Sequence, residues 1–279
     1  MQAVLLGLAA ALIWGLHDFL VRLISPGANV LGQILTVTAV GVVILAVPGG
    51  RDLALLSPQA LGLAVLSGIG YIVAYFCLYR AFALAPARVV SPILGAYPLL
   101  TMLVAALTGT EVPWNDWLAV VAVVAGIAVV AVLAEAEGHG NVRVGAALIW
   151  AGLSAAGFAA TFALGQAASV GDLSLAAGLV TRVVALLGIL TLVVLSRPSL
   201  QPVLQNWKAL GVMGLLDTAA LALVMLAGGW PNAEYASVAA SLFGLVTILL
   251  AWWFLGERVR LAQWLGLALV FAGIAWLAG

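Results

Sequence analysis

Long apolar segments follow one another along the chain and are separated by short breaks. Each segment has about 20 residues, the length that a helix needs to cross the hydrocarbon core of a membrane. The breaks contain Gly, Pro or charged residues, which favour turns. The pattern therefore predicts ten transmembrane helices, at residues 3–24, 29–48, 59–83, 86–109, 113–134, 144–168, 174–196, 207–229, 232–255 and 259–278.

The segment from residue 86 to residue 126 occurs twice. At a constant offset of 146 residues, five positions carry the same residue in both copies, pairing Ala87, Ser91, Thr101, Ala105 and Glu111 with Ala233, Ser237, Thr247, Ala251 and Glu257. One inserted residue later, Trp117 and Gly126 match Trp264 and Gly273. The matched Glu and Trp make chance agreement a poor explanation, so the chain is a duplication.

The two copies are expected to enter the membrane in opposite directions, because each contains five helices, an odd number. Residues 1–134 form the first five-helix repeat, 135–143 the connecting loop and 144–279 the second repeat. Such inverted repeats are typical of secondary transporters, in which the two halves open a central site to alternate sides. The predicted fold is an all-α polytopic membrane protein, with ten transmembrane helices as two inverted five-helix repeats around a central cavity.

The composition agrees with a membrane protein and excludes several other classes. Of the 279 residues, 66% are hydrophobic and 7% are charged, whereas soluble domains have about 25% charged residues. The net charge of zero gives no support for nucleic-acid binding. The single cysteine, Cys77, cannot form an internal disulfide and is interpreted as a packing residue. The first segment contains His17, Asp18 and Arg22, so we interpret it as part of the working protein and not as a cleavable signal.

Basic residues are unevenly distributed between the two sides of the predicted membrane domain. Eight lie near odd-numbered connections, namely Arg22, Arg80, Arg88, Arg143, Arg197, Lys208, Arg258 and Arg260, and two lie near even ones, Arg51 and Arg182. The positive-inside rule then predicts that the odd connections are cytoplasmic and that both termini are outside. Arg80 and Arg88 are interpreted as solvated interface residues, with attraction of an anionic carboxylate as the alternative.

Several short motifs resemble those of a known transporter family. They are Trp14-Gly15, Tyr97-Pro98, Gly109-Thr110-Glu111 and Leu255-Gly256-Glu257-Arg258, together with Gln263 and Gly266. With these motifs, essentially the whole chain resembles the EamA family of the drug/metabolite transporter superfamily, and most of all its YddG-type bacterial exporters of aromatic amino acids. The resemblance implies ten helices in an inverted repeat, a cavity that opens to one side at a time, and export of small metabolites, amino acids especially.

Three ionisable residues lie deep inside predicted spans, where a charge costs about 2.5–3.5 kcal/mol. They are His17 and Asp18 in the first span and Asp217 in the eighth. We predict that His17 and Asp217 line the cavity, and that Asp18 and Asp217 are candidates for proton coupling, with facilitated diffusion down the substrate gradient as the alternative. His17 and Asp18 are neighbours on a helix, so their side chains are expected to point about 100° apart. The structural alternatives are an ion pair between Asp18 and Arg22, and a cross-helix hydrogen bond for Asp217.

Aromatic residues provide the second part of the predicted site. Tyr71, Tyr75 and Tyr79 are spaced four apart and form one stripe on the third helix, and Tyr97 lies in the next helix. Trp14 is three residues before His17 and shares its face of the first helix. We predict that these residues line the substrate cavity, because a wall of rings with hydroxyl groups suits a flat amphipathic ligand. The alternative is that the tyrosines only pack in the core or mark the interface.

Two further features concern the helices themselves. Pro92 and Pro98 interrupt the backbone hydrogen bonds of the fourth helix, whereas the matched positions in the ninth helix are Val238 and Gly244. The fourth and ninth helices are therefore expected to bend differently. The matched Glu111 and Glu257 are interpreted as structural loop caps and not as coupling groups.

The sequence as a whole predicts a secondary transporter. The substrates expected are amino acids, aromatic and other apolar ones first, exported by alternating access across a bacterial inner membrane. Motifs of metalloproteases and of P-loop ATPases are absent, and the two histidines do not suggest a metal site, so no enzyme activity, metal or cofactor is expected. A single chain contains both inverted halves, so a monomer would suffice, in contact with lipid and with a small-molecule substrate and without nucleic acid. The alternatives are a proton-coupled exporter of drugs or other metabolites, and a membrane scaffold or lipid-handling protein that transports nothing.

Overall fold

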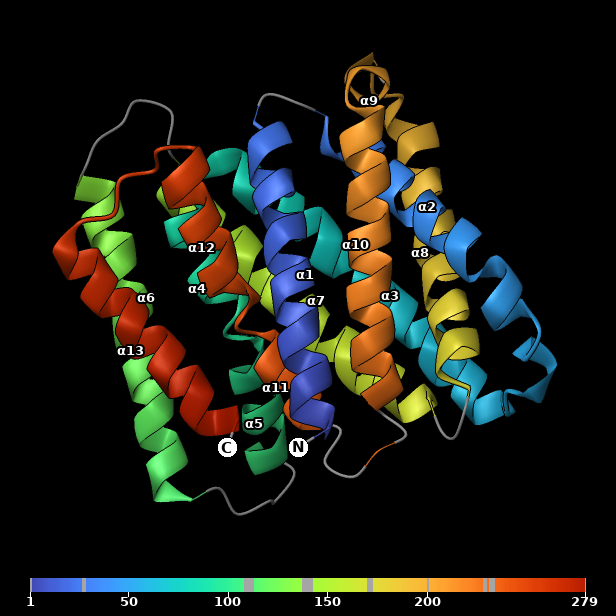
Figure 1. Ribbon diagram of the computed structural model, residues 1–279, viewed down its shortest axis with the longest axis horizontal. Coiled ribbons are helices and arrows are strands. Elements are labelled where there is room, and N and C mark those ends of the chain that lie inside the picture. The colour runs from blue at the N-terminus through green and yellow to red at the C-terminus, as the bar shows by residue number, and fades with distance from the viewer. Residues whose placement is uncertain are drawn as a thin grey trace.

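The structure, a computed structural model, describes residues 2–26, 29–107, 113–136, 143–169, 173–199, 201–227, 230 and 234–278. These residues form helices and short connections (Figure 1). The helices are α1 (Gln2–Ile24), α2 (Val30–Gly50), α3 (Pro58–Leu84), α4 (Ala87–Leu94), α5 (Tyr97–Leu107), α6 (Trp114–Ala136), α7 (Val144–Ala168), α8 (Ser174–Ser196), α9 (Gln201–Gln205), α10 (Trp207–Leu226), α11 (Glu234–Ala240), α12 (Phe243–Phe254) and α13 (Leu261–Ala278), with a 3-10 turn η1 (Leu53–Leu55).

All ten predicted spans are occupied by helix within the described residues, so the all-α polytopic fold is confirmed. Seven helices are long and apolar enough to cross a membrane, by length and composition. One of these seven spans, Tyr235–Phe254, includes most of α11 and all of α12. The remaining three spans contain shorter apolar stretches, Ala87–Leu100, Trp114–Val130 and Leu261–Trp276.

The fourth and ninth spans are interrupted in the middle. The break between α4 and α5 falls at residues 95–96, and the break between α11 and α12 falls at residues 241–242. The offset between the two breaks is the same 146 residues that relates the repeats. The second copy is therefore interrupted at the matched site without a proline, and the expectation that the two helices bend differently stays a prediction.

The two breaks lie against each other. A Cβ atom added to Gly95 would lie 2.7 Å from the backbone oxygen of Ser241, and one added to Gly244 would lie 2.8 Å from that of Ser91. Both separations are too short for a real side chain, so glycine is required at both places. α4 and α12 consequently cross with their backbones nearly touching.

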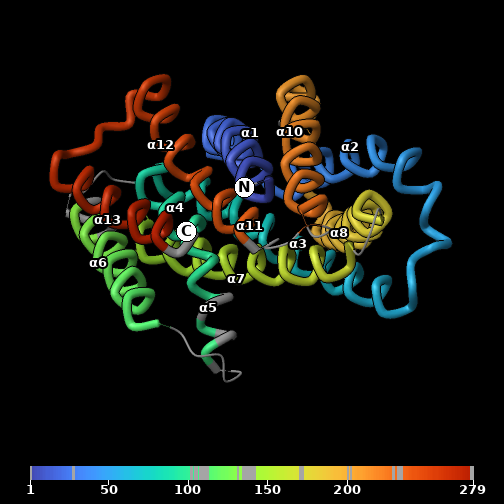
Figure 2. The backbone as a smooth tube through the Cα atoms, turned by 60° about the horizontal axis from the view of Figure 1, so that its bottom comes forward, coloured from blue at the N-terminus to red at the C-terminus, as the bar shows by residue number. Residues whose placement is uncertain are grey.

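Each half packs its first helix against the third helix of the other half. α3 packs along α7, and in the matched arrangement α10 packs along α1. Figure 1 shows that α1 and α7 run in opposite directions and that both chain ends lie at the lower edge of the view. In Figure 2, α6 with α13 and α2 with α8 form the two flanks, and α1, α4, α10 and α11 lie between them. This interleaved arrangement brings side chains from both halves together in the middle.

Candidate functional site

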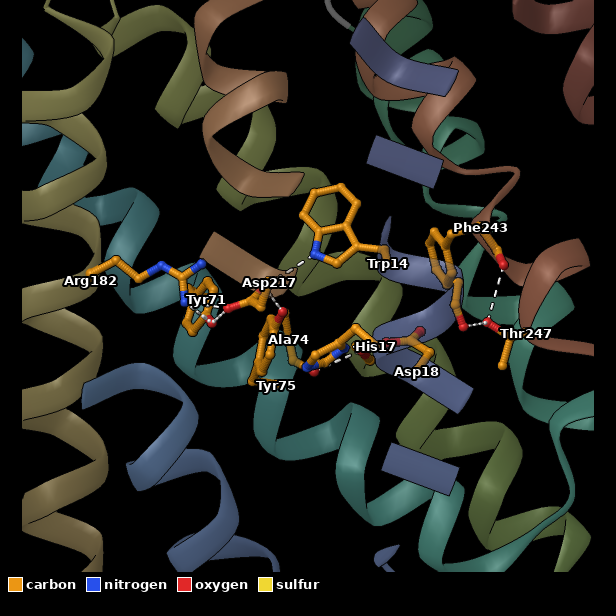
Figure 3. Close-up of polar contacts among 12 residues, drawn as sticks. Trp14, His17, Asp18, Tyr71, Ala74, Tyr75, Arg182, Asp217, Phe243 and Thr247 are labelled. Atoms are coloured by element: carbon orange, nitrogen blue, oxygen red, sulfur yellow. Dashed lines mark hydrogen bonds and ion pairs between the residues drawn. The ribbon is translucent and has the colours of Figure 1, made fainter. Parts of the chain in front are cut away.

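A polar cluster lies at the centre of the helix assembly, around the carboxylate of Asp217 on α10 (Figure 3). Trp14 on α1 donates its indole N–H to Oδ1 at 3.1 Å, and the Tyr71 hydroxyl on α3 donates to Oδ2 at 2.5 Å. Tyr75 donates to Oδ1 and the Arg182 guanidinium on α8 donates to Oδ2. One carboxylate thus joins four helices of the two halves.

Two partners of Asp217, Tyr71 and Tyr75, are positioned by the regular spacing of residues along α3. Tyr71 and Tyr75 are one helical turn apart, and their rings stack with centroids 4.1 Å apart. The Arg182 guanidinium lies 4.8 Å from the centroid of the Tyr71 ring, and its Nη1 also donates to the Tyr71 hydroxyl at 2.6 Å. The ion pair between Arg182 and Asp217 is completely buried, and both side chains are 0% exposed.

A second polar pair lies nearby on α1. His17 Nδ1 and Asp18 Oδ1 are 2.8 Å apart, although the two residues are adjacent in sequence. The expectation that their side chains diverge is therefore wrong: each turns toward the other along the helix surface. The His17 ring packs near Tyr75 and Tyr79, with centroid separations of 5.8 and 6.3 Å. Both His17 and Asp18 are buried.

The alternative that paired Asp18 with Arg22 is also wrong. Arg22 donates to Glu257 in the connection after α12, at 2.7 Å, and to the backbone oxygen of Phe82 at 2.9 Å. The second carboxylate oxygen of Glu257 accepts from the backbone N–H of Ala87, the first residue of α4, at 2.9 Å. This network caps a helix and joins the two halves at one end. Its counterpart in the repeat, Glu111, lies outside the described residues.

Aromatic side chains of α7 lie beside Trp14 and Tyr75, two of the residues that bind Asp217. Trp14 lies 5.2 Å from Phe162 and 6.5 Å from Phe243, measured between ring centroids. Tyr97 lies 5.0 Å from Phe162 and donates its hydroxyl to the backbone oxygen of Ser237. Phe158 stacks on Phe162 at 5.5 Å. The rings form one continuous apolar wall next to the buried charges.

The structure brings all of the predicted site residues together in the interior. Trp14, His17, Tyr71, Tyr75, Tyr79, Tyr97, Asp217 and the coupling candidate Asp18 are all buried. Their side chains largely contact one another. Asp217 makes hydrogen bonds to residues of other helices, as the structural alternative for this residue predicted. Tyr79 is 0% exposed, so its side chain packs in the protein core. The role of these residues in binding a substrate stays a prediction.

Sequence reasoning missed Arg182 and the phenylalanines of α7. The distribution of basic residues suggests that Arg182 lies near a connection, whereas it is the ninth residue of the 23-residue helix α8 and lies in the core. Arg182 therefore does not indicate which side of the membrane its neighbouring connection faces. Without it, Arg51 is the one basic residue in the sequence near an even-numbered connection. The sequence does contain a sign of this role, because an arginine so far inside an apolar span needs a buried partner for its charge. Phe158 and Phe162 are spaced four apart, which placed them on one face of α7.

An inverted helical repeat with ionisable groups buried where its halves meet is the architecture of a membrane transporter. The model of the EamA-like transporter family matches residues 1–132 and 145–279. The chain therefore belongs to the EamA-like transporter family, and it is a multi-pass membrane transporter for a small molecule and not an enzyme. Its two halves are the two EamA repeats.

The fold also has a counterpart among solved structures. A structure described as "Crystal structure of protein" is similar to the chain, with a TM-score of 0.66 and 22% sequence identity. The similarity covers 98% of this chain and 95% of that chain. At this level of identity the likeness shows the fold alone. No curated protein sequence matches the chain.

Proposed function

We propose that this transporter exports amino acids, aromatic and other apolar ones first, by alternating access between residues 1–134 and 144–279. One observation carries the proposal: a buried pair of opposite charges, Arg182 and Asp217, lies directly beside a wall of aromatic rings. A zwitterionic amino acid presents the same combination in reverse, with a carboxylate, an ammonium group and an apolar side chain. Its charged ends match the ion pair, and its side chain matches the rings.

The proposal assigns the ligand-binding role to Trp14, His17, Tyr71, Tyr75, Tyr79, Tyr97 and Asp217, to which Arg182 is added. Asp18 and Asp217 remain the candidates for proton coupling, since both are carboxylates in the core. The uneven distribution of basic residues supports cytoplasmic odd connections, which for a bacterial protein corresponds to the inner membrane. The resemblance to YddG-type exporters rests on the same aromatic residues, which is why aromatic amino acids are placed first among the proposed substrates.

The test is efflux from proteoliposomes loaded with labelled phenylalanine, threonine or a cationic dye, with and without a pH gradient. Phenylalanine should leave the vesicles fastest. Tyr75→Ala, which removes a ring that contacts Tyr71, His17 and Phe158, should slow phenylalanine efflux about tenfold, the effect of about 1.4 kcal/mol. Asp217→Asn should abolish it. Gly62→Ala is the control, because nothing lies within 4 Å of the added atom, and it should transport like the wild type.

Other outcomes select among the alternatives. Dye efflux that requires a pH gradient and Asp217, without movement of amino acids, would replace the proposal with a proton-coupled drug exporter. Phenylalanine efflux that is faster with the pH gradient, and loses that acceleration in Asp18→Asn, would assign coupling to Asp18. Absence of flux for all three substrates would reject amino-acid export and leave another small metabolite as the substrate.

A further inference from the structure

The guanidinium group of Arg182 uses only one of its nitrogens. Nη1 donates both to Asp217 and to the Tyr71 hydroxyl. Nε and Nη2 are buried and have no hydrogen-bond partner within the part of the chain that the structure describes. The edge of the guanidinium that carries these two nitrogens is therefore unpaired, although the side chain is 0% exposed.

Asp217 cannot serve this edge as well. Its two oxygens already accept from Trp14, Tyr71, Tyr75 and Arg182. Leaving a buried charged donor unsatisfied is costly, and a native core normally pairs such groups. Because no described residue pairs with it, the Nε and Nη2 edge is the side of Arg182 on which a ligand can bind.

The shape of the edge defines the chemistry of that partner. Nε–H and Nη2–H of an arginine point in parallel and bind both oxygens of one carboxylate. Gly41 on α2 lies close to the Arg182 guanidinium. Thr38 is one helical turn before Gly41. Its hydroxyl is buried and also has no hydrogen-bond partner among the described residues. A Cβ atom added to Gly41 would lie 2.7 Å from Thr218 Oγ1 and 3.1 Å from Arg182 Nη1, so the absence of a side chain on α2 lets the guanidinium lie at this place.

We propose that the Nε and Nη2 edge of Arg182 anchors the carboxylate of the transported molecule. The inference rests on the proposed function for the remainder of the ligand and specifies which group binds its acidic end. Arg182 and Asp217 cancel each other's charge, so a bound zwitterion leaves the site neutral. A simple carboxylic acid leaves one negative charge and binds more weakly than the amino acid of the same size.

The experiment measures binding to purified protein in detergent, as ligand-induced thermal stabilisation over a concentration series. The probes are phenylalanine, 3-phenylpropionate and its uncharged counterpart 3-phenylpropionamide. Replacing the carboxylate by the amide removes the charge and one of the two acceptor oxygens. The amide should bind about tenfold to hundredfold more weakly than the acid, the effect of about 1.5–3 kcal/mol for hydrogen bonds to a charged group.

Arg182→Lys supplies the second comparison, since it keeps the positive charge and loses the two parallel donors. The variant should bind 3-phenylpropionate and 3-phenylpropionamide with nearly equal affinity. Arg51→Lys is the matched control, because Arg51 is exposed directly after the end of α2, and it should keep the wild-type preference. The wild-type comparison of acid and amide stands by itself if Arg182→Lys does not fold.

Equal affinity of the wild type for acid and amide, or absence of binding by either, would overturn the inference. Retention of the full preference in Arg182→Lys would do the same. The two proposals fail separately. Binding of the acid without phenylalanine efflux would keep Arg182 as a carboxylate anchor and reject amino-acid export, whereas phenylalanine efflux with no acid preference would do the opposite.

Discussion

The two repeats of this transporter share a backbone and differ in their buried chemistry. Their broken helices are interrupted at matched residues, 95–96 and 241–242, and cross each other there. The polar residues of the centre are not matched. Asp217 corresponds to Tyr71, Arg182 to Thr36, and the pair His17 and Asp18 to Ala163 and Leu164.

The contact between Tyr71 and Asp217 explains part of this difference. These residues occupy the same position in the two repeats, and they hydrogen-bond to each other at 2.5 Å. Two matched positions that touch lie at the axis that relates the halves. An aspartate in both repeats would place two carboxylates at one point, where like charges disfavour ionisation of both. A tyrosine opposite an aspartate supplies a donor for the acceptor instead.

The ends of the molecule differ as well. Arg22 and Glu257 join the two halves at one end, and the residue that matches Arg22 in the second repeat is Ala168, which has no charge. The backbone therefore carries the symmetry that two exchanging halves need, whereas the side chains make the halves unequal. Substitutions at matched positions test this division directly.

The largest expected effect is that of Asp217→Ala. It leaves the buried Arg182 without its counter-ion, which costs about 3–5 kcal/mol. Denaturant unfolding of the purified protein should show a loss of this size. Loss of less than about 1 kcal/mol would mean that solvent or a rearranged side chain reaches Arg182, contrary to its burial.

The glycines at the crossing should behave alike in the two repeats. Gly95→Ala and Gly244→Ala each bring a methyl group against a backbone oxygen, at 2.7 and 2.8 Å, and each should destabilise the protein by about 1–3 kcal/mol. The same unfolding measurement provides the values. Gly211→Ala, with nothing within 4 Å of the new atom, should not destabilise it. A large cost at one crossing glycine and none at the other would contradict the matched geometry.

Loss of a single hydroxyl group should have a smaller effect. Tyr71→Phe removes the hydrogen bonds of Tyr71 with Asp217 and Arg182, at a cost of about 1–2 kcal/mol for polar contacts within a membrane. Tyr79→Phe is the matched control on the same stripe, because the Tyr79 hydroxyl has no partner among the residues that the structure describes. Equal thermal stabilities of the two variants would contradict the described network.

The smallest effect is expected at the end of the molecule. Glu257→Gln weakens the contacts with Arg22 and with the backbone of Ala87, in a place where the Arg22 side chain is 20% exposed. Partial exposure limits the loss to about 0.5–1 kcal/mol. Arg258→Gln, at the neighbouring exposed residue, should leave the melting temperature unchanged, and a larger loss at Arg258 than at Glu257 would place the ion pair elsewhere.

The sequence was sufficient for the fold, because spans of about 20 apolar residues and a repeat offset are visible without coordinates. The grouping of Trp14, His17, the tyrosines and Asp217 was also predictable, since buried polar residues need partners. The contacts between individual side chains could not be predicted from the sequence. Helical spacing favoured Asp18 with Arg22, whereas packing between halves brought Glu257 to Arg22. Arg182 was not recognised because a charge in an apolar sequence can mark either a membrane side or a buried ion pair.

The most direct test of the account replaces the central ion pair by apolar residues of similar size, in the double variant Arg182→Met with Asp217→Leu. Buried ion pairs replaced in this way are often as stable as before or more stable. The account predicts that the double variant recovers most of the stability lost in Asp217→Ala, and that the phenylalanine efflux expected of the wild type is abolished in it. Wild-type efflux from the double variant would contradict it, because the two charges would then serve the fold and not the transported molecule.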